Sequence, residues 1–303
     1  MNNHMNLNNA NHKDEIDIKK LLLIIWQGKL LIATLTILFS FAALFYSLSL
    51  QNIYQSHAVL SATEGSNSNN QSSSLGGLAS IAGINIQSGS VGKTALAIEK
   101  IKTLSFFEEN ILPYIFLPDL MAIKSWDAES NTNVYNEDIY DPIKKLWIST
   151  PSSQTSYRSF RSILSVKENR DGSLITISIK HNSPYVAQAW TELIVNQINN
   201  YYRSIDEQEA LKSMNFLNAQ MSQTTYTELK QVISQLIKQK MQKLTLIEAN
   251  EFYIFSYLDP PKVMETKIEP DRISILILGA VIGVMLGIIL VMIRKFLGFK
   301  ELE

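Results

Sequence analysis

The chain has no cysteine among its 303 residues. This absence excludes disulfide bonds, thiolate metal sites and a cysteine nucleophile in one step. The chain also has no excess of charge of either sign, because 27 Lys and Arg residues nearly balance 28 Asp and Glu residues. Proteins that bind nucleic acid usually carry a basic excess, so the composition gives no indication of a nucleic-acid partner.

Motifs for catalysis and metal binding are missing as well. The four histidines are His4, His12, His57 and His181. No two of them have helical metal-ligand spacing, and none stands in an H-E-x-x-H context. One group of acids is interpreted as a solvated helix face: Asp206, Glu207 and Glu209. We therefore expect no catalytic site, no metal and no cofactor.

One short segment imitates a nucleotide site. Residues 89–94, GSVGKT, end like a phosphate loop, but the first glycine of that motif would stand at position 87, where the sequence has Gln87. We interpret this segment as the start of a helix.

Two long uncharged apolar runs stand out, Leu30 to Leu50 and Ile273 to Ile293. A helix that crosses the hydrocarbon core of a bilayer needs about 20 such residues. A cleaved signal peptide is the alternative for the first run, but its apolar core is shorter, about 7–15 residues, and lies closer to the N-terminus. The sequence therefore predicts two membrane-spanning helices.

Lysine and arginine near these runs predict their orientation. The basic residues that flank the runs on the side of the two termini are Lys13, Lys19, Lys20, Lys29, Arg294, Lys295 and Lys300. The stretch from Gln51 to Gly92, which follows the first run, has neither Lys nor Arg. We expect tails 1–29 and 294–303 in the cytoplasm and residues 51–272 outside it, in the periplasm of a bacterium.

The second run carries glycines at every fourth position, Gly279, Gly283 and Gly287. Four residues are close to one helical turn, so the three glycines share one face, and small residues there let another helix approach closely. The partner could be the first span or a neighbouring copy.

The segment between the runs mixes strand and helix patterns. Apolar alternation predicts a strand at Ile53–Ala62 and a hairpin of Ile163–Lys167 and Leu174–Lys180 around Asp171-Gly172. Residues 64–74, EGSNSNNQSSS, are polar and of low complexity, and residues 75–90, LGGLASIAGINIQSGS, follow; both are typical of flexible or irregular surface segments. Helical spacing predicts a helix at Val91–Leu112, ended by Pro113 and Pro118, and a shorter helical piece at Ile143–Ile148.

A long helix is predicted after Ser183-Pro184, a capping serine followed by proline at the first helical position. It extends to about Met221, and a second helix begins near Glu228, with a bend within Ser222–Thr227. About 40 helical residues would extend about 60 Å, which is typical of a stalk or an oligomer surface. An apolar face of the second helix could contact a neighbouring protomer or pack in the core of its own: Leu229, Val232, Leu236 and Met241.

A strand is predicted next, at Phe252–Leu258, followed by a segment with Pro260, Pro261 and Pro270. Proline fixes the backbone and donates no hydrogen bond. We expect this segment to be extended and stiff, and to position the outer domain over the membrane.

With these features the chain resembles the bacterial polysaccharide co-polymerases, and among them the Wzz-type O-antigen chain-length determinants. Four stretches carry the resemblance: DEIDIKKLLLIIWQGK, LGGLASIAGINIQSGSVGKTALAIEKIKT, ITISIKHNSPYVAQAWTELIVNQIN and ELKQVISQLIKQKMQKLTLIEANEFYIFSYLDPPKVME. The last is the most specific, because a strand and prolines follow the long helix directly.

The resemblance implies an α+β fold, with two transmembrane helices flanking a periplasmic α/β domain that carries a long projecting helix, and a ring-forming homo-oligomer in the bacterial inner membrane. It implies a non-enzymatic regulator of O-antigen length in lipopolysaccharide, acting with the O-antigen polymerase on the growing lipid-linked polysaccharide. The alternative is a co-polymerase for capsule or exopolysaccharide that works with an outer-membrane channel. Only a short tail follows Ile293, so we expect no fused kinase and no output module of a sensor.

Overall fold

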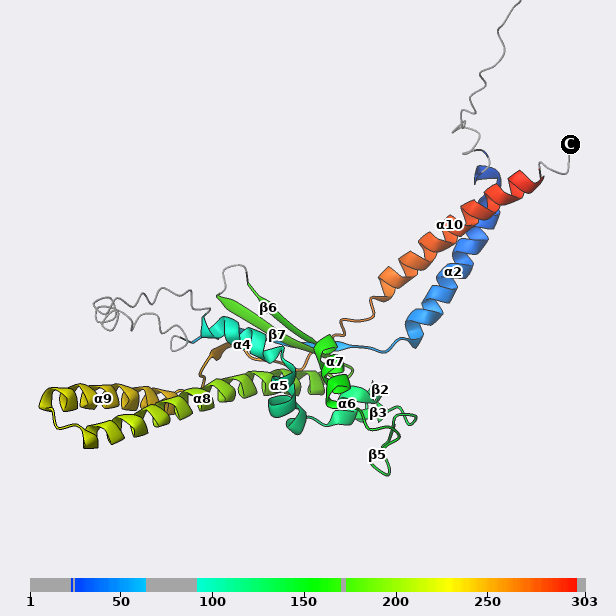
Figure 1. The fold of residues 1–303 in the computed structure, drawn as a ribbon. Coiled ribbons are helices and arrows are strands. Elements are labelled where there is room, and N and C mark those ends of the chain that lie inside the picture. The colour runs from blue at the N-terminus through cyan, green and yellow to red at the C-terminus, as the bar shows by residue number, and fades with distance from the viewer. Residues whose placement is uncertain (1–22, 24, 64–91, 170–172, 299–303) are drawn as a thin grey trace, which may run out of the picture. The chain divides into compact units, whose positions relative to one another are not determined.

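The computed structural model describes residues 23, 25–63, 92–169 and 173–298 (Figure 1). The chain divides into two compact units, residues 1–50 with 269–303 (unit 1) and residues 51–268 (unit 2). Several predictions lie outside the described residues: the N-terminal tail, most of the stretch before the first span, the irregular segment 64–90 and the turn at Asp171-Gly172.

Unit 1 is a pair of apolar helices, α2 (Lys29–Ser49) and α10 (Arg272–Gly298). Both are long and apolar enough to cross a membrane, judged by length and composition. Hydroxyl groups within α2 bond inside the helix, since Thr34 and Thr36 each donate to the carbonyl four residues earlier, at 2.8 Å. This satisfies polar groups that lipid cannot satisfy.

Unit 2 is built on a four-stranded antiparallel sheet in the order β6-β7-β1-β8. Its strands are β1 (Tyr54–Ala62), β6 (Leu164–Glu168), β7 (Leu174–His181) and β8 (Phe255–Asp259). β1 lies in the middle, with Tyr54 opposite His181 and Ser61 opposite Leu174. The predicted strands and the antiparallel pairing of β6 with β7 are confirmed, and β8 starts three residues later than predicted.

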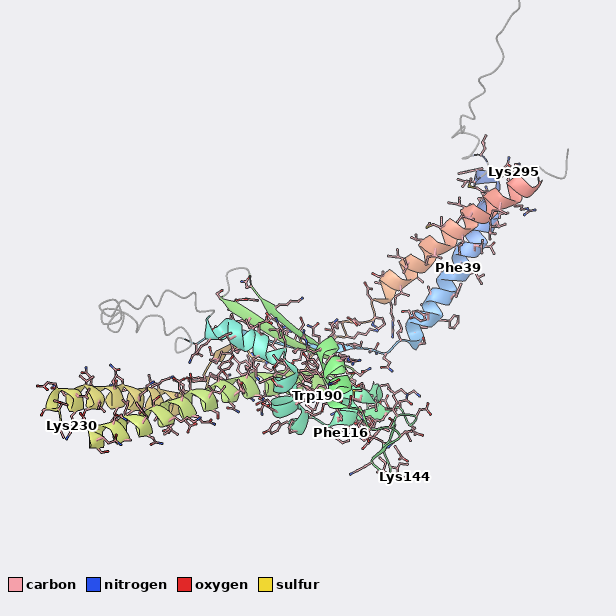
Figure 2. The ribbon with its side chains drawn as sticks, in the orientation of Figure 1. Phe39, Phe116, Lys144, Trp190, Lys230 and Lys295 are labelled. Atoms are coloured by element: carbon pink, nitrogen blue, oxygen red, sulfur yellow. The ribbon has the colours of Figure 1, made fainter. Side chains whose placement is uncertain are left out.

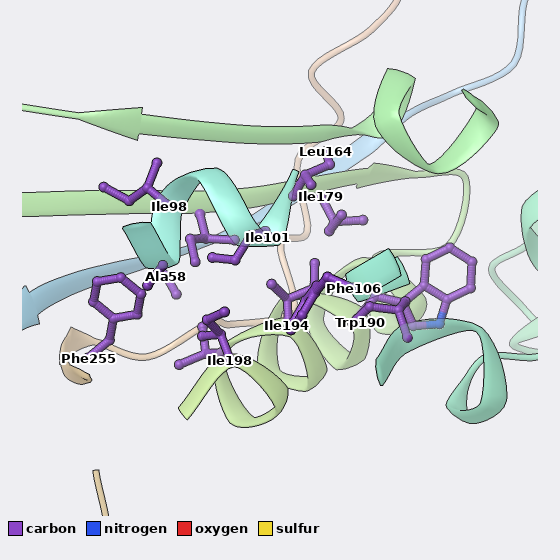
Figure 3. Packing of buried hydrophobic residues seen from close by; sticks show 14 of the residues in the cluster. Ala58, Ile98, Ile101, Phe106, Leu164, Ile179, Trp190, Ile194, Ile198 and Phe255 are labelled. Carbon is purple, nitrogen blue, oxygen red and sulfur yellow. The ribbon is translucent and has the colours of Figure 1, made fainter. Parts of the chain in front are cut away.

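The core of unit 2 lies on one face of this sheet, against α8 (Pro184–Gln223) and α4 (Lys93–Ile101) (Figure 3). Alternate residues of the strands point inward, as the two-residue period of a strand requires. Fully buried sheet residues are Ala58, Leu60, Ile175, Ile177, Ile179 and Phe255. From α8, Trp190, Ile194 and Ile198 recur at helical spacing and meet them. The first third of α8 is therefore a core helix.

The rest of α8 leaves the sheet and pairs with α9 (Thr227–Ala249), and the two form an extended helical hairpin (Figure 1). Ser183 is the N-cap of α8 and accepts from the amide of Val186, with Pro184 next in sequence. The helix breaks only at residues 224–226. The predicted start, length and bend are confirmed.

The single helix predicted at Val91–Leu112 is wrong, because the segment is broken into four short pieces. They are α4, α5 (Leu104–Phe106), the π-helical turn η2 (Phe107–Ile111) and the 3₁₀ turn η3 (Leu112–Tyr114). Thr103 ends the first piece, since its backbone is extended and its hydroxyl accepts from the amide of Phe106. This is N-cap behaviour in the middle of an apolar pattern. Pro113 lies inside η3 rather than after a helix.

Residues 117–148 form a small lobe of short elements beside the sheet. They are α6 (Leu117–Met121), β2 (Ile123–Asp127), β3 (Thr132–Tyr135), β4 (Tyr140–Asp141) and β5 (Leu146–Trp147), and α7 (Ser153–Ile163) follows. The helical piece predicted at Ile143–Ile148 is wrong. Asp141 Oδ1 accepts from the amides of Ile143 and Lys144, and Lys145 has a φ of 55°, so the chain turns into a hairpin instead.

Candidate functional site

The three glycines predicted to pack all face α2 within unit 1. A Cβ added to Gly283 would lie 2.7 Å from the Cα of Thr36, and one added to Gly287 would lie 2.9 Å from the Cα of Ile32. A Cβ at Gly279 would meet that of Ala43 at 2.4 Å. A residue larger than glycine does not fit at these three positions, because most of the atoms that its Cβ would meet belong to the backbone of α2. We name Gly279, Gly283 and Gly287 the glycine seam.

The close contact continues at the N-terminal end of α2, where α2 supplies the glycine and α10 the larger side chain. Gly28, the N-cap of α2, faces Val291, and a Cβ there would lie 2.4 Å from Val291 Cγ2. Sequence reasoning missed Gly28, although Val291 stands four residues after Gly287 and marks the same helix face. The two antiparallel helices of one chain are thus in direct contact. A role of the seam in assembly of several chains stays a prediction.

The three predicted prolines are not brought together. Pro261 is buried and Pro260 is exposed, both just after β8 in unit 2, while Pro270 belongs to unit 1. The segment between them is held to the start of β1. Ser56 Oγ donates to the carbonyl of Lys262 at 2.8 Å, and the amide of Ile268 donates to the carbonyl of Ile53 at 2.8 Å. Its role in positioning stays a prediction.

The predicted contact face of α9 is largely open to solvent in a single chain. Leu229, Val232 and Met241 are 48%, 54% and 57% exposed, and Leu236 is half-buried. Other α9 residues make the contact with the rest of the protomer, chiefly Ile233 and Ile247, which are buried. The three exposed side chains therefore remain available to a partner.

A polar cluster around Asp206 stands where the helical hairpin leaves the sheet. Its carboxylate accepts from Lys93 Nζ at 2.5 Å and from the hydroxyl of Tyr253, and Lys243 Nζ lies 3.5 Å away. Asp206 is 4% exposed, so the prediction that it belongs to a solvated face is wrong. Lys93, the lysine of the segment GSVGKT that resembles a phosphate loop, forms this ion pair with Asp206.

The cluster perturbs the titration of its members. Burial alone would raise the pKa of Asp206, but the hydrogen bonds from Lys93 and Tyr253 outweigh it and hold that pKa below its usual range. Burial and the hydrogen bond to the Asp206 carboxylate raise the pKa of Tyr253. Asp206 is therefore ionised and Tyr253 protonated at neutral pH.

Two further side chains of α8 hold the segment that returns from α9 to β8. Asn199 Oδ1 accepts from the amides of Ile254 and Phe255, and its Nδ2 donates to the carbonyl of Phe255. Arg203 donates to the carbonyls of Asn250 and Glu251, both at 2.6 Å. With Asp206 they stand at intervals of four and three residues, which places all three on one helix face.

The arrangement of the described residues consists of polar anchors between elements and of exposed apolar surfaces. Among the residues that the structure describes, no group of three or more His, Asp or Glu side chains could hold a metal ion. The polar clusters are internal ties between elements. The surfaces left for partners are the exposed side chains of the helical hairpin and of the small lobe (Figure 2).

Comparison with known proteins gives one match to a family model, over about a third of the chain. The sequence model of the Wzz family, described as chain length determinant protein, matches residues 14–111. No curated protein matches the chain.

Among solved structures, a full-length bacterial polysaccharide co-polymerase aligns with 96% of this chain and 100% of its own, at 13% identity and a TM-score of 0.43. A fragment of WzzB, a polysaccharide co-polymerase from Salmonella Typhimurium, aligns with 72% of this chain and 100% of its own, at 12% identity and a TM-score of 0.31.

Proposed function

We propose that the chain is a member of the Wzz chain length determinant family, whose sequence model matches residues 14–111, and that it sets the length of a bacterial surface polysaccharide without catalysing its synthesis. The family match is the observation that carries this proposal. The matched residues take in the first span, the central strand β1 and the turns up to Ile111. Two apolar helices near the termini fit an inner-membrane protein.

We further propose that the polysaccharide is the O-antigen of lipopolysaccharide, and that the protein acts together with the polymerase that joins lipid-linked repeat units. The resemblance of four sequence stretches to the O-antigen determinants supports this choice over capsule or exopolysaccharide. The growing polysaccharide and the polymerase are then the partners of unit 2 and of the membrane helices.

The working form is proposed to be a homo-oligomeric ring. The exposed Leu229, Val232 and Met241 of α9 support it, since a neighbouring protomer would remove these side chains from water. A closed ring also joins several copies of a small domain into one large continuous surface. Unit 2 is proposed to lie in the periplasm, on the strength of the lysines and arginines that flank the two apolar runs.

Deletion of the gene, with electrophoresis of the surface polysaccharide, tests the function. We expect polymer to be made but its preferred length to be lost, with recovery when the intact chain is supplied again. An unchanged ladder contradicts length control, and complete loss of polymer contradicts a purely regulatory role. A change confined to capsule or exopolysaccharide, with lipopolysaccharide unaltered, contradicts the choice of O-antigen.

A further inference from the structure

The β4–β5 hairpin of the small lobe exposes an unusual amount of aliphatic surface. Ile143 is 91% exposed, Leu146 60% and Ile148 68%. Single exposed aliphatic residues are common in proteins, whereas three within six positions form a patch. A patch of this kind marks an interaction surface.

The hairpin has two distinct faces. Tyr140 and Trp147 are register partners with ring centroids 5.0 Å apart, and the Tyr140 ring lies against Phe116 and Tyr135. This aromatic face packs inward, and Tyr140 is buried. Because side chains alternate along a strand, Leu146 and Ile148 point to the opposite face. The aliphatic surface therefore follows from the register of a packed hairpin.

The tip of the hairpin, residues 141–146, carries one aspartate and two lysines, a net charge of +1. Asp141 accepts from two backbone amides of the turn, and Lys144 Nζ lies 3.2 Å from Asp141 Oδ2. Lys144 and Lys145 are exposed and stand between Ile143 and Leu146 in the sequence. Figure 2 shows Lys144 at the end of the small lobe. The acids Glu137 and Asp138 come before β4, away from the turn. Lysines next to exposed aliphatic side chains are the composition of a membrane-interface segment.

The lobe lies at the end of unit 2 where the chain enters and leaves it. The ring of Trp126 is 5.5 Å from that of Tyr54, at the start of β1, and 6.1 Å from that of Tyr185, in the first turn of α8. The exit is beside the entrance, since the amide of Ile268 donates to the carbonyl of Ile53. The far end of α8 is about 60 Å along the helix axis, at 1.5 Å per residue.

We propose that the β4–β5 hairpin is a third membrane contact, in which Ile143, Leu146 and Ile148 enter the headgroup region and Lys144 and Lys145 meet anionic lipid phosphates. The single positive charge by which the two lysines exceed Asp141 is complementary to such lipids. The lobe is also next to Tyr54, five residues after the end of α2 at Ser49. The proposal rests on membrane insertion of α2 and α10, and is independent of which polysaccharide is regulated.

The absence of cysteine allows a direct test in the full chain. Single variants Ile143→Cys and Ile148→Cys are labelled with a fluorophore after reconstitution in phosphatidylethanolamine–phosphatidylglycerol vesicles. Quenching by lipid-attached doxyl groups is compared with quenching by aqueous iodide. Matched controls are Glu129→Cys, on the exposed turn of the same lobe, and Tyr226→Cys, between α8 and α9 and 72% exposed.

At positions 143 and 148 we expect quenching by the doxyl groups and little quenching by iodide. At positions 129 and 226 we expect quenching by iodide and little quenching by the doxyl groups. Lys145→Asn removes one charge and tolerates the left-handed backbone. It should weaken the inserted state about fivefold, because a lysine near an anionic surface contributes about 1 kcal/mol. Iodide access at 143 equal to that at 226 overturns the proposal. Shielding from both quenchers also overturns it, since a second copy or another protein then covers the hairpin.

Discussion

Asp206 is a single residue that ties together four separate segments. Its carboxylate links its own position in the middle of α8 to three other segments. These are the start of α4 through Lys93, the second half of α9 through Lys243, and the residues just before β8 through Tyr253. Asn199 and Arg203 on the same face hold the chain between Asn250 and Phe255. The direction in which the helical hairpin leaves the core therefore depends on three polar side chains of one helix.

Replacing Asp206 by asparagine is expected to destabilise unit 2. Asp206→Asn removes the charge that Lys93 and Lys243 face, and the loss should be about 2 kcal/mol, in the range for hydrogen bonds to charged groups. The cost stays below that of a fully buried pair, because both lysine side chains are about one-third exposed and regain water. Urea unfolding of the purified chain, followed by tryptophan fluorescence, measures it.

Glu209→Gln is the matched control, since Glu209 is an exposed acid on the same helix. Its effect should stay within about 0.5 kcal/mol, as for most surface substitutions. Equal unfolding midpoints for the two variants would show that the Asp206 cluster does not stabilise the fold.

His181 predicts a pH dependence of stability. Its Nδ1 accepts from the amide of Ser183 at 2.9 Å, so Nε2 carries the proton and donates to the carbonyl of Asp119. Burial lowers the pKa of His181 below its ordinary value of 6.5. The unfolded chain then binds more protons below about pH 6.5, so stability is full above that pH and falls on acidification.

The slope contributed by this one group can reach at most about 1.4 kcal/mol per pH unit. His181→Gln should lower stability at all pH values but flatten the decline between pH 7 and pH 5. Urea midpoints measured across that interval check it. Parallel declines in the parent and the variant contradict a neutral buried histidine.

Sequence could not identify Asp206 as buried, for a physical reason. Its partner Lys93 lies 113 positions away, and its neighbours Glu207 and Glu209 have the composition of a solvated face. Ser183, by contrast, was predicted as a cap because its partner, the amide of Val186, is three residues away. The cap at Ser183 leaves a sequence pattern, because a proline follows it, and the long-range ion pair of Asp206 leaves none.

At the scale of elements, the length of an uninterrupted apolar period separates correct predictions from wrong ones. The strands and the long helix were predicted because their apolar period is sustained over many residues. The Val91–Leu112 helix failed because apolar spacing continues across Thr103, whose hydroxyl starts a new helix. Residues 143–148 failed because the side chain of Asp141 closes a turn, a contact that competes with helix formation.

The exposed face of α9 predicts an oligomer contact. Val232→Glu introduces a charge on a side chain that is 54% exposed, so the isolated protomer should fold normally. In an oligomer the same charge would lose water, and the particle mass in detergent should fall. Light scattering of the purified chain measures it. Gln235→Glu, at an exposed polar position of the same helix, is the control and should leave the mass unchanged.

If Val232→Glu leaves the particle mass unaltered while Leu229→Glu and Met241→Glu also have no effect, α9 is not the contact between protomers. The exposed aliphatic side chains would then need another partner, such as the polysaccharide or the polymerase.

The glycine seam predicts a strong position effect within α10. Gly283→Leu places a side chain against the backbone of Thr36, so α2 and α10 must separate. Overpacking of this kind costs about 1–3 kcal/mol. We expect earlier thermal aggregation in detergent, because the helix pair of each chain loses its close contact. Val284→Leu, on an exposed side of the same helix, is the control and should behave as the parent chain. Identical behaviour of the two variants contradicts close packing at the seam.

At the scale of the whole molecule, the first and last residues of unit 2 lie side by side and are hydrogen-bonded to each other. The amide of Ile268 donates to the carbonyl of Ile53, and Lys267 Nζ donates to Asn52 Oδ1 at 3.0 Å. The sequence predicted the strands but could not predict that β1 and β8, distant in the chain, lie side by side. It did predict the two spans, because the thickness of a bilayer fixes the length of an apolar helix.

The distribution of lysine and arginine predicts the sidedness of the whole chain, and the absence of cysteine again makes it measurable. Glu129→Cys lies in unit 2 and Lys295→Cys lies at the end of α10, and both side chains are exposed. In cells with a permeabilised outer membrane, a thiol reagent that cannot cross the inner membrane should label position 129 and not position 295. After the inner membrane is opened with detergent, both positions should label. Labelling of position 295 in intact inner membranes would place the C-terminal basic residues outside the cytoplasm, against the preference of Lys and Arg for the cytoplasmic side.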